Sequence, residues 1–79
     1  MTQFERSIAS IIRAERKNAS MTQKDFAFKL NVNYLTYREY ERGNISMPLR
    51  IFFKACLLLE LDPTETGKKA SDIAKNNNI

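Results

Sequence analysis

Apolar residues recur at helical spacing along most of the chain, and residues that start or stop helices separate these runs. The first run follows Thr2, and Glu5 lies three residues later, so the two side chains can form a capping box. This first helix is expected to end near Asn18, where Asn-Ala-Ser interrupts the periodicity. Its predicted inner face consists of Phe4, Ile8, Ile11 and Ile12.

A second, shorter helix is predicted to begin after Thr22. The Thr22 hydroxyl is a good N-cap, and the Asp25 carboxylate, three residues later, can reach back to the cap amide. The apolar residues that come next at helical spacing predict that one face of this helix is buried. They are Phe26, Ala27 and Leu30.

A three-residue turn and a third helix complete the segment 22–43. Asn31 tolerates the left-handed conformation that ends a helix, and Asn33 is a second N-cap. The third helix is expected over residues 34–42, before Gly43 ends it. Two short capped helices joined in this way form a helix-turn-helix unit.

A fourth helix is expected over residues 49–60, because Gly43 and Pro48 bracket a loop and proline suits the first turn of a helix. Its apolar positions are Leu49, Phe52, Ala55, Cys56 and Leu59.

The last segment carries a start signal but a weak pattern. Asp62 and Pro63 mark a helix start, whereas Gly67 weakens the helical tendency of the residues after it. Residues 68–75 are therefore expected to form a marginal helix, and residues 76–79 to be disordered. No strand alternation or repeat is present, so the fold class is all-α, a compact bundle of about five helices.

Composition limits the classes of protein. A chain of 79 residues has room for one small domain, and its single cysteine, Cys56, excludes an internal disulfide and favours a reducing cytoplasm. No apolar run approaches the roughly 18 residues of a membrane span. The chain has no histidine and only one cysteine, which are too few ligands for a metal site of the histidine and cysteine type. Its two glycines are too few for a glycine-rich loop that binds phosphate. We therefore expect no enzyme activity, metal or cofactor.

The net charge of +4 lies entirely in residues 1–50, whereas residues 51–79 are balanced. A localised positive charge suits a polyanionic partner, because contacts to phosphates supply most of the sequence-independent affinity for DNA.

The order and spacing of several motifs resemble the lambda-repressor-like family of helix-turn-helix DNA-binding proteins, also called the Cro/cI or xenobiotic-response-element type. The similarity covers roughly residues 7–65. Asn31 stands where the family usually has glycine, and Tyr37 and Tyr40 replace aliphatic residues of the inner face of the recognition helix. The matching motifs are Arg16, Met21-Thr22-Gln23, Phe26-Ala27, Leu30-Asn31-Val32, Glu41-Arg42-Gly43 and the Pro48-led helix ending in Leu59-Glu60-Leu61.

The resemblance implies that residues 34–42 form the recognition helix. If Tyr37 and Tyr40 face the core, the base contacts fall to Tyr34, Leu35, Arg38 and Glu39 on the outer side. The alternative is that these four are ordinary solvated surface. The phosphate contacts that the resemblance implies are Gln23, Lys24, Asn33, Thr36, Arg42 and Asn44, with Arg50 as a further candidate.

Two further roles concern structure and assembly. Arg16 and Glu41 resemble a pair that forms a salt bridge in this family, although they could be two independent surface charges. The helix over 49–60 has more apolar surface than one core face needs, so Phe53, Leu57 and Leu58 are expected to form a homodimer interface. The alternative is that the C-terminal segment covers them.

These observations predict a helix-turn-helix DNA-binding domain over residues 1–66 and a marginally helical to disordered tail over 67–79. The expected function is a cytoplasmic, prokaryotic or phage transcriptional regulator. It would be a Cro-like or restriction–modification-controller-like repressor that binds a palindromic operator in double-stranded DNA as a homodimer. Two alternatives stay open: an antitoxin whose apolar surface binds a toxin, and a helical protein-interaction module without DNA affinity.

Overall fold

Five helices connected by short loops make up the part of the chain that the computed structural model describes, residues 1–77. The prediction of an all-α fold of about five helices is confirmed. The helices are α1 (Gln3–Asn18), α2 (Gln23–Leu30), α3 (Tyr34–Arg42), α4 (Leu49–Leu58) and α5 (Pro63–Asn77).

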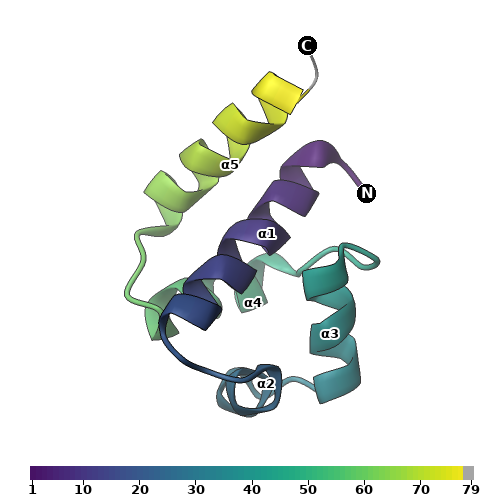
Figure 1. Ribbon diagram of the computed structural model, residues 1–79, viewed down its shortest axis with the longest axis vertical. Coiled ribbons are helices and arrows are strands. Elements are labelled where there is room, and N and C mark those ends of the chain that lie inside the picture. The colour runs from purple at the N-terminus through teal and green to yellow at the C-terminus, as the bar shows by residue number, and fades with distance from the viewer. Residues whose placement is uncertain (78–79) are drawn as a thin grey trace.

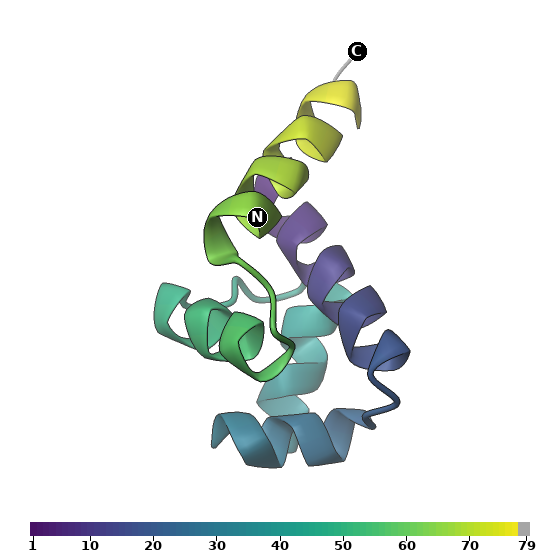
Figure 2. The same cartoon turned by 90° about the vertical axis from the view of Figure 1, so that its left-hand side faces the viewer.

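Helix α1 lies between α5 and α3 (Figure 1). α5 runs along α1 in roughly the opposite direction, and α2 lies across the end of the molecule next to the start of α3. Figure 2 shows α2 and the end of α5 at opposite ends of the molecule. The α2–α3 unit therefore has one side against α1 and α4 and another side facing solvent.

The core is small. All five helices contribute buried apolar side chains to it, and the most extensive contacts are those of α1 with α5, α2 with α3 and α1 with α3. Burial of each large side chain contributes about 1.5–3 kcal/mol to folding. The largest fully buried side chains are Tyr37, Phe26, Ile12, Leu30 and Cys56.

The start of α1 is fixed by the predicted capping box, in which the Thr2 and Glu5 side chains each bond the other's backbone amide. Ser46, in the loop between α3 and α4, also donates a hydrogen bond to the Glu5 carboxylate. The hydrogen bond from Ser46, together with those from Thr2, lowers the pKa of Glu5 to about 2. This loop is thereby tied to the start of α1.

Two residues predicted for the inner faces of helices are exposed. The Phe4 side chain, on the first turn of α1, is 43% exposed, and Leu49, at the start of α4, is 66% exposed. In α4 the buried face begins instead at Ile51 and includes Phe52, Ala55 and Cys56. The prediction for Leu49 was wrong because α4 is apolar on more than one side, so periodicity does not single out its inner face.

The C-terminal segment is more ordered than predicted. α5 is one continuous helix from Pro63 to Asn77, and it passes Gly67 and the predicted boundary at residue 66 without interruption. Ala70 and Ala74, one turn apart, are buried where α5 packs along α1. The helix expected over 68–75 is present, whereas the disorder expected from residue 76 was wrong for residues 76–77, because burial against α1 outweighs the cost of glycine. The end of the predicted tail, residues 78–79, lies outside the described residues.

Candidate nucleic-acid interface

The turn between α2 and α3 has the geometry that its asparagines predicted. Asn31 ends α2 in the left-handed conformation, with φ at 59°, and its backbone amide bonds back to α2. The Asn33 side-chain oxygen accepts a hydrogen bond from the Leu35 amide at 2.9 Å, which caps α3. At the other end of α3, Gly43 is also left-handed, with φ at 76°. Together these caps fix the position and length of α3.

The inner face of α3 is aromatic. Tyr37 is fully buried and Tyr40 nearly so, as expected if both face the core. The ring of Tyr37 packs edge-to-face on both Phe26 of α2, at 5.5 Å between centroids, and Tyr40, at 6.4 Å. Aromatic packing therefore determines how α3 is rotated about its axis.

A buried network of polar side chains joins α1, α2 and α3. The salt bridge between Arg16 and Glu41 is present, with Nε and Oε2 2.7 Å apart and Nη2 and Oε1 3.0 Å apart. The Glu41 carboxylate also accepts hydrogen bonds from the Gln23 amide, at 2.9 Å, and from the Tyr37 hydroxyl. A third Arg16 donor, Nη1, bonds the Met21 carbonyl oxygen at 2.6 Å. One carboxylate thus holds the end of α3 against both other helices.

The pKa values of this network favour the ion pair. Burial alone would raise the pKa of Glu41, but hydrogen bonds from Arg16, Tyr37 and Gln23 outweigh it and leave that pKa below its ordinary value. The hydrogen bond to Glu41 raises the pKa of Arg16. Burial, and then the hydrogen bond to Glu41, raise the pKa of the Tyr37 hydroxyl, which stays protonated as a donor.

Of the four side chains expected to contact bases, Leu35, Arg38 and Glu39 lie on the side of α3 away from the two buried tyrosines, whereas Tyr34, at the start of α3, also packs against the core. Leu35 is 62% exposed, and the other three are partly exposed. The Tyr34 ring lies near two cations: Lys24 Nζ is 5.4 Å and Arg38 Cζ 5.9 Å from its centroid. Tyr34 therefore acts as a platform for two positively charged side chains.

Glu39 is tied to the C-terminal end of α3. Its carboxylate accepts a hydrogen bond from the Asn44 side-chain amide at 2.6 Å and lies 3.7 Å from the Arg42 guanidinium. Arg42 and Asn44 are exposed, and Glu39 is partly exposed. A cytosine amino group would therefore have to compete with Asn44 and Arg42 for the Glu39 carboxylate.

The residues expected to contact phosphates fall into two places. Arg50, at the start of α4, lines a small polar pocket beside Asn31 and Lys54, whose ammonium donates to the Leu30 carbonyl at 3.1 Å. Lys54 was not among the predicted contacts, because no motif marks it. The remaining candidates lie on α2, on α3 or just beside the ends of α3. They are Gln23, Lys24, Asn33, Thr36, Arg42 and Asn44.

Besides Arg42 and Asn44, which contact Glu39, Gln23 and Asn33 already have structural roles. One amide N–H of Gln23 donates to Glu41, so the other N–H is the one left for a phosphate. The Asn33 oxygen caps α3, which leaves its side-chain amide as the donor. The structure orients both side chains through these bonds.

The residues predicted for a dimer interface do not share one environment. Phe53 and Leu57 are adjacent on the outside of α4, and Leu57 is 77% exposed. Leu58 is partly buried and packs against the core of its own chain. The exposed apolar surface of α4 therefore consists of Leu49, Phe53 and Leu57 rather than of the three predicted residues.

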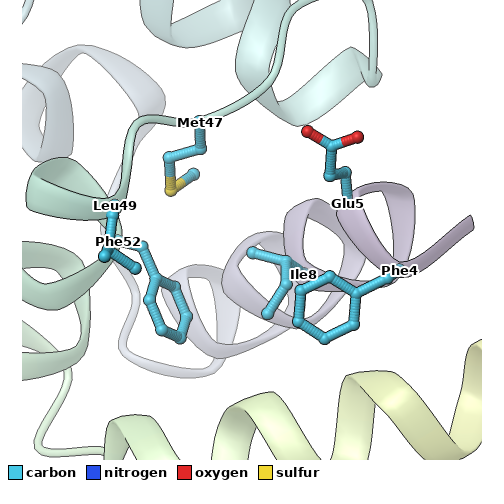
Figure 3. Close-up of a pocket in the computed structure, with 6 residues that line it drawn as sticks. All are labelled: Phe4, Glu5, Ile8, Met47, Leu49 and Phe52. Atoms are coloured by element: carbon cyan, nitrogen blue, oxygen red, sulfur yellow. The ribbon is translucent and has the colours of Figure 1, made fainter. Parts of the chain in front are cut away.

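An apolar pocket lies next to this surface, between the start of α1, the loop before α4 and α4 itself. Figure 3 shows the side chains of Met47, Phe52, Ile8 and Phe4 around it, with the Glu5 carboxylate on the far side from Phe52. Leu49 lines its edge, so the pocket continues the exposed surface of α4.

Two further observations concern residues 1–77. No group of three or more histidine, cysteine or acidic residues there is placed to hold a metal ion. Over the same stretch, none of the helices has the length and apolar character needed to cross a bilayer.

Two short helices joined by a three-residue turn, with the second helix exposed on one face, define a helix-turn-helix protein. A family model described as helix-turn-helix matches residues 12–65, which is most of the chain. The chain belongs to this family, the lambda-repressor and Cro-like helix-turn-helix proteins, and is a DNA-binding transcription regulator of the Cro/cI type. Searches of curated proteins and of solved structures gave no match.

Proposed function

We propose that the protein is a repressor that binds a palindromic operator in double-stranded DNA as a homodimer. The observation that supports this most directly is the division of α3 into two faces. Tyr37, Tyr40 and Glu41 hold one face against the rest of the protein, while the opposite face offers side chains to the major groove. A bound dimer would prevent access of RNA polymerase to an overlapping promoter.

Each side chain on the outer face suits a particular base edge. The Arg38 guanidinium can donate two hydrogen bonds to guanine, and the Glu39 carboxylate can accept one from the cytosine amino group. Tyr34 and Leu35 offer apolar surface to thymine methyl groups. The mixture of charged and apolar side chains favours an operator that contains both G·C and A·T pairs.

The proposed phosphate contacts lie around these residues. Lys24 is on α2, Asn33 and Thr36 are at the start of α3, and Arg42 and Asn44 are at its end. Contacts at both ends of α3 would fix its depth and angle in the groove without selecting a sequence. Gln23 and Arg50 would bind phosphates from the flanking helices.

The homodimer is proposed from the apolar surface of α4. Phe53, Leu57 and Leu49 are exposed apolar side chains of one helix, and Leu49 also lines the apolar pocket, so together they form a surface of the kind that often marks a protein contact. A two-fold axis at this surface would present two recognition helices to half-sites about 34 Å apart. In this proposal Leu58 supports the surface from below.

Selection of bound duplexes from a random pool, together with a solution mass measurement, tests the proposal. We expect a palindromic site with half-site centres about 10 base pairs apart and the mass of a dimer. Leu57→Ser should shift the mass toward the monomer, whereas Phe28→Ser should not, although Phe28 is even more exposed, at 85%. A monomer on an asymmetric site would contradict the dimeric repressor.

A second candidate is an antitoxin with the same DNA-binding face. The exposed apolar surface of α4 and the adjoining pocket favour it, because a toxin could cover them instead of a second copy. A monomeric mass for the protein alone, with a toxin gene adjacent, would favour this candidate. An adjacent restriction endonuclease gene would instead indicate a controller protein. Absence of binding to genomic fragments at low salt would favour the helical protein-interaction module.

A further inference from the structure

A polar pocket lies where α1, the start of α2 and one edge of α3 come together. Three of the residues that line it are arginines, Arg13 from α1 and Arg38 and Arg42 from α3. Gln23 and Glu41 complete the lining. The pocket measures about 210 Å³ and is open to solvent.

Helix geometry explains why these arginines converge. Arg38 and Arg42 are four residues apart, so they lie one above the other on one side of α3, and both line this pocket together with Arg13 of α1. Figure 1 shows α3 beside α1, with α2 across their lower ends. Arg13 lies one turn before Arg16 on α1. The Arg16 guanidinium donates to Glu41, which is itself part of the pocket lining.

The charge in the pocket is positive, although the Glu39 carboxylate lies 3.7 Å from the Arg42 guanidinium. Glu41 is its carboxylate, but Arg16 neutralises that charge, and the Glu41 side chain is only 2% exposed. Arg13 is exposed, and in the part of the chain that the structure describes no carboxylate oxygen lies within ion-pairing distance of it. Its neighbours one turn away on α1 are Ala9, Ser10, Arg16 and Lys17, which offer no negative charge.

We infer that this pocket binds a phosphate of the DNA backbone and that Arg13 is a phosphate-contact residue. Guanidiniums around one small pocket repel one another unless an anion lies between them, and a phosphate can accept the N–H donors of Arg13 and Arg42 while Arg38 contacts guanine. The pocket adjoins the recognition face, since Arg38 belongs to both. The inference rests on the proposed binding of duplex DNA and brings α1 into the interface.

The salt dependence of binding to two duplexes, one selected and one of unrelated sequence, tests the inference. Loss of one phosphate contact reduces the slope of log K against log[salt] by about 0.9, which weakens binding about eightfold at 0.1 M salt. We expect this change for Arg13→Gln on both duplexes, with an unchanged base preference. Arg13→Lys keeps the charge and should retain most of the slope.

The matched control is Lys68→Gln, which makes the same charge change on α5, on the far side of α1 from α3. Its slope should equal that of the wild type. An unchanged slope for Arg13→Gln, or an equal loss in both variants, would overturn the role of Arg13 while leaving DNA binding intact. A wild-type protein that bound neither duplex would overturn the proposed function and this inference with it.

Discussion

The Arg16 guanidinium and the Glu41 carboxylate meet as a two-pronged ion pair, with N–O distances of 2.7 and 3.0 Å and side chains only 7% and 2% exposed. The pair connects the end of α1 to the end of the recognition helix. A buried pair of this kind is costly to break on one side, because the remaining charge stays buried without a partner.

Substitution at either residue of this pair should therefore destabilise the fold. We expect Glu41→Gln to lower the free energy of unfolding by about 3–5 kcal/mol. Arg16→Lys keeps the charge but cannot bond both Glu41 oxygens and the Met21 carbonyl, so we expect a loss of about 1–3 kcal/mol. Urea unfolding followed by circular dichroism measures both changes.

The exposed pair of Glu39 and Arg42 provides the control for these variants, since its N–O distance is 3.7 Å and its side chains are much more exposed. Arg42→Lys should change the free energy of unfolding by less than about 0.5 kcal/mol. Equal effects of Arg16→Lys and Arg42→Lys would show that the buried network contributes no more than a surface pair.

Acid should destabilise the protein through the same carboxylate. The pKa of Glu41 in the folded state lies below its ordinary value, so in acid the unfolded state takes up a proton that the folded state does not. The stabilisation is fully present above the ordinary pKa and is lost as the pH falls through the folded-state value. Thermal unfolding of the wild type should therefore occur at lower temperature as the pH falls from about 5 to 3.

Glu5 contributes to the same pH range, because its pKa is lowered to about 2. The measurement is therefore made in a Glu5→Gln background, with and without Glu41→Gln. In the Glu5→Gln background, acid should lower the unfolding temperature less when Glu41→Gln is also present than when Glu41 is intact. An identical pH profile in the two proteins would contradict the depressed pKa of Glu41.

The sequence predicted the helix-turn-helix unit well because local chemistry determines it. Thr22, Asn33 and Gly43 sit at the ends of α2 and α3 as helix caps, and each cap acts within a few residues of itself. The burial of Tyr37 and Tyr40 followed from helical spacing. These features depend little on what the rest of the chain does.

The unpredicted features depend on contacts between distant segments. The inner face of α4 was ambiguous because Leu49, Phe53 and Leu57 are as apolar as the residues that are buried. The length of α5 was underestimated because small residues such as Ala70 give a weak hydrophobic pattern in the sequence. In the fold, these small residues allow close packing against α1. No sequence motif marks Arg13. It lines the same pocket as Arg38 only because α1 and α3 lie side by side in the fold.

The two glycines of the chain should respond to alanine in opposite directions. Gly67 lies inside α5, and a Cβ there would meet no atom within 4 Å, so Gly67→Ala should stabilise the protein by about 0.5–1 kcal/mol. Gly43 has φ at 76°, so Gly43→Ala should destabilise by about 1–2 kcal/mol. Thermal unfolding measures both, and the first change corresponds to about 2–8 °C in Tm. A lower Tm for Gly67→Ala would contradict the continuous helix at this position.

Tyr34 offers a test of how the recognition face is organised. Its ring lies near both Lys24 and Arg38, and each cation–π contact at an exposed site contributes about 0.5–1 kcal/mol. If the ring holds these two cations in place for DNA, Tyr34→Phe should bind the selected operator as tightly as the wild type. Tyr34→Leu should bind it more weakly by roughly 1–2 kcal/mol, because both contacts are lost.

The same pair of variants separates this role from a direct contact by the Tyr34 hydroxyl. A hydrogen bond from that hydroxyl to a base or phosphate would be lost in both variants, so Tyr34→Phe would then weaken binding as well. Base preference adds a second measure. Arg38→Ala should relax discrimination at one base position by about 1–3 kcal/mol, and Tyr34→Leu should relax the same position in part, because it frees the guanidinium. Retention of full discrimination at that position by Tyr34→Leu would contradict the platform role.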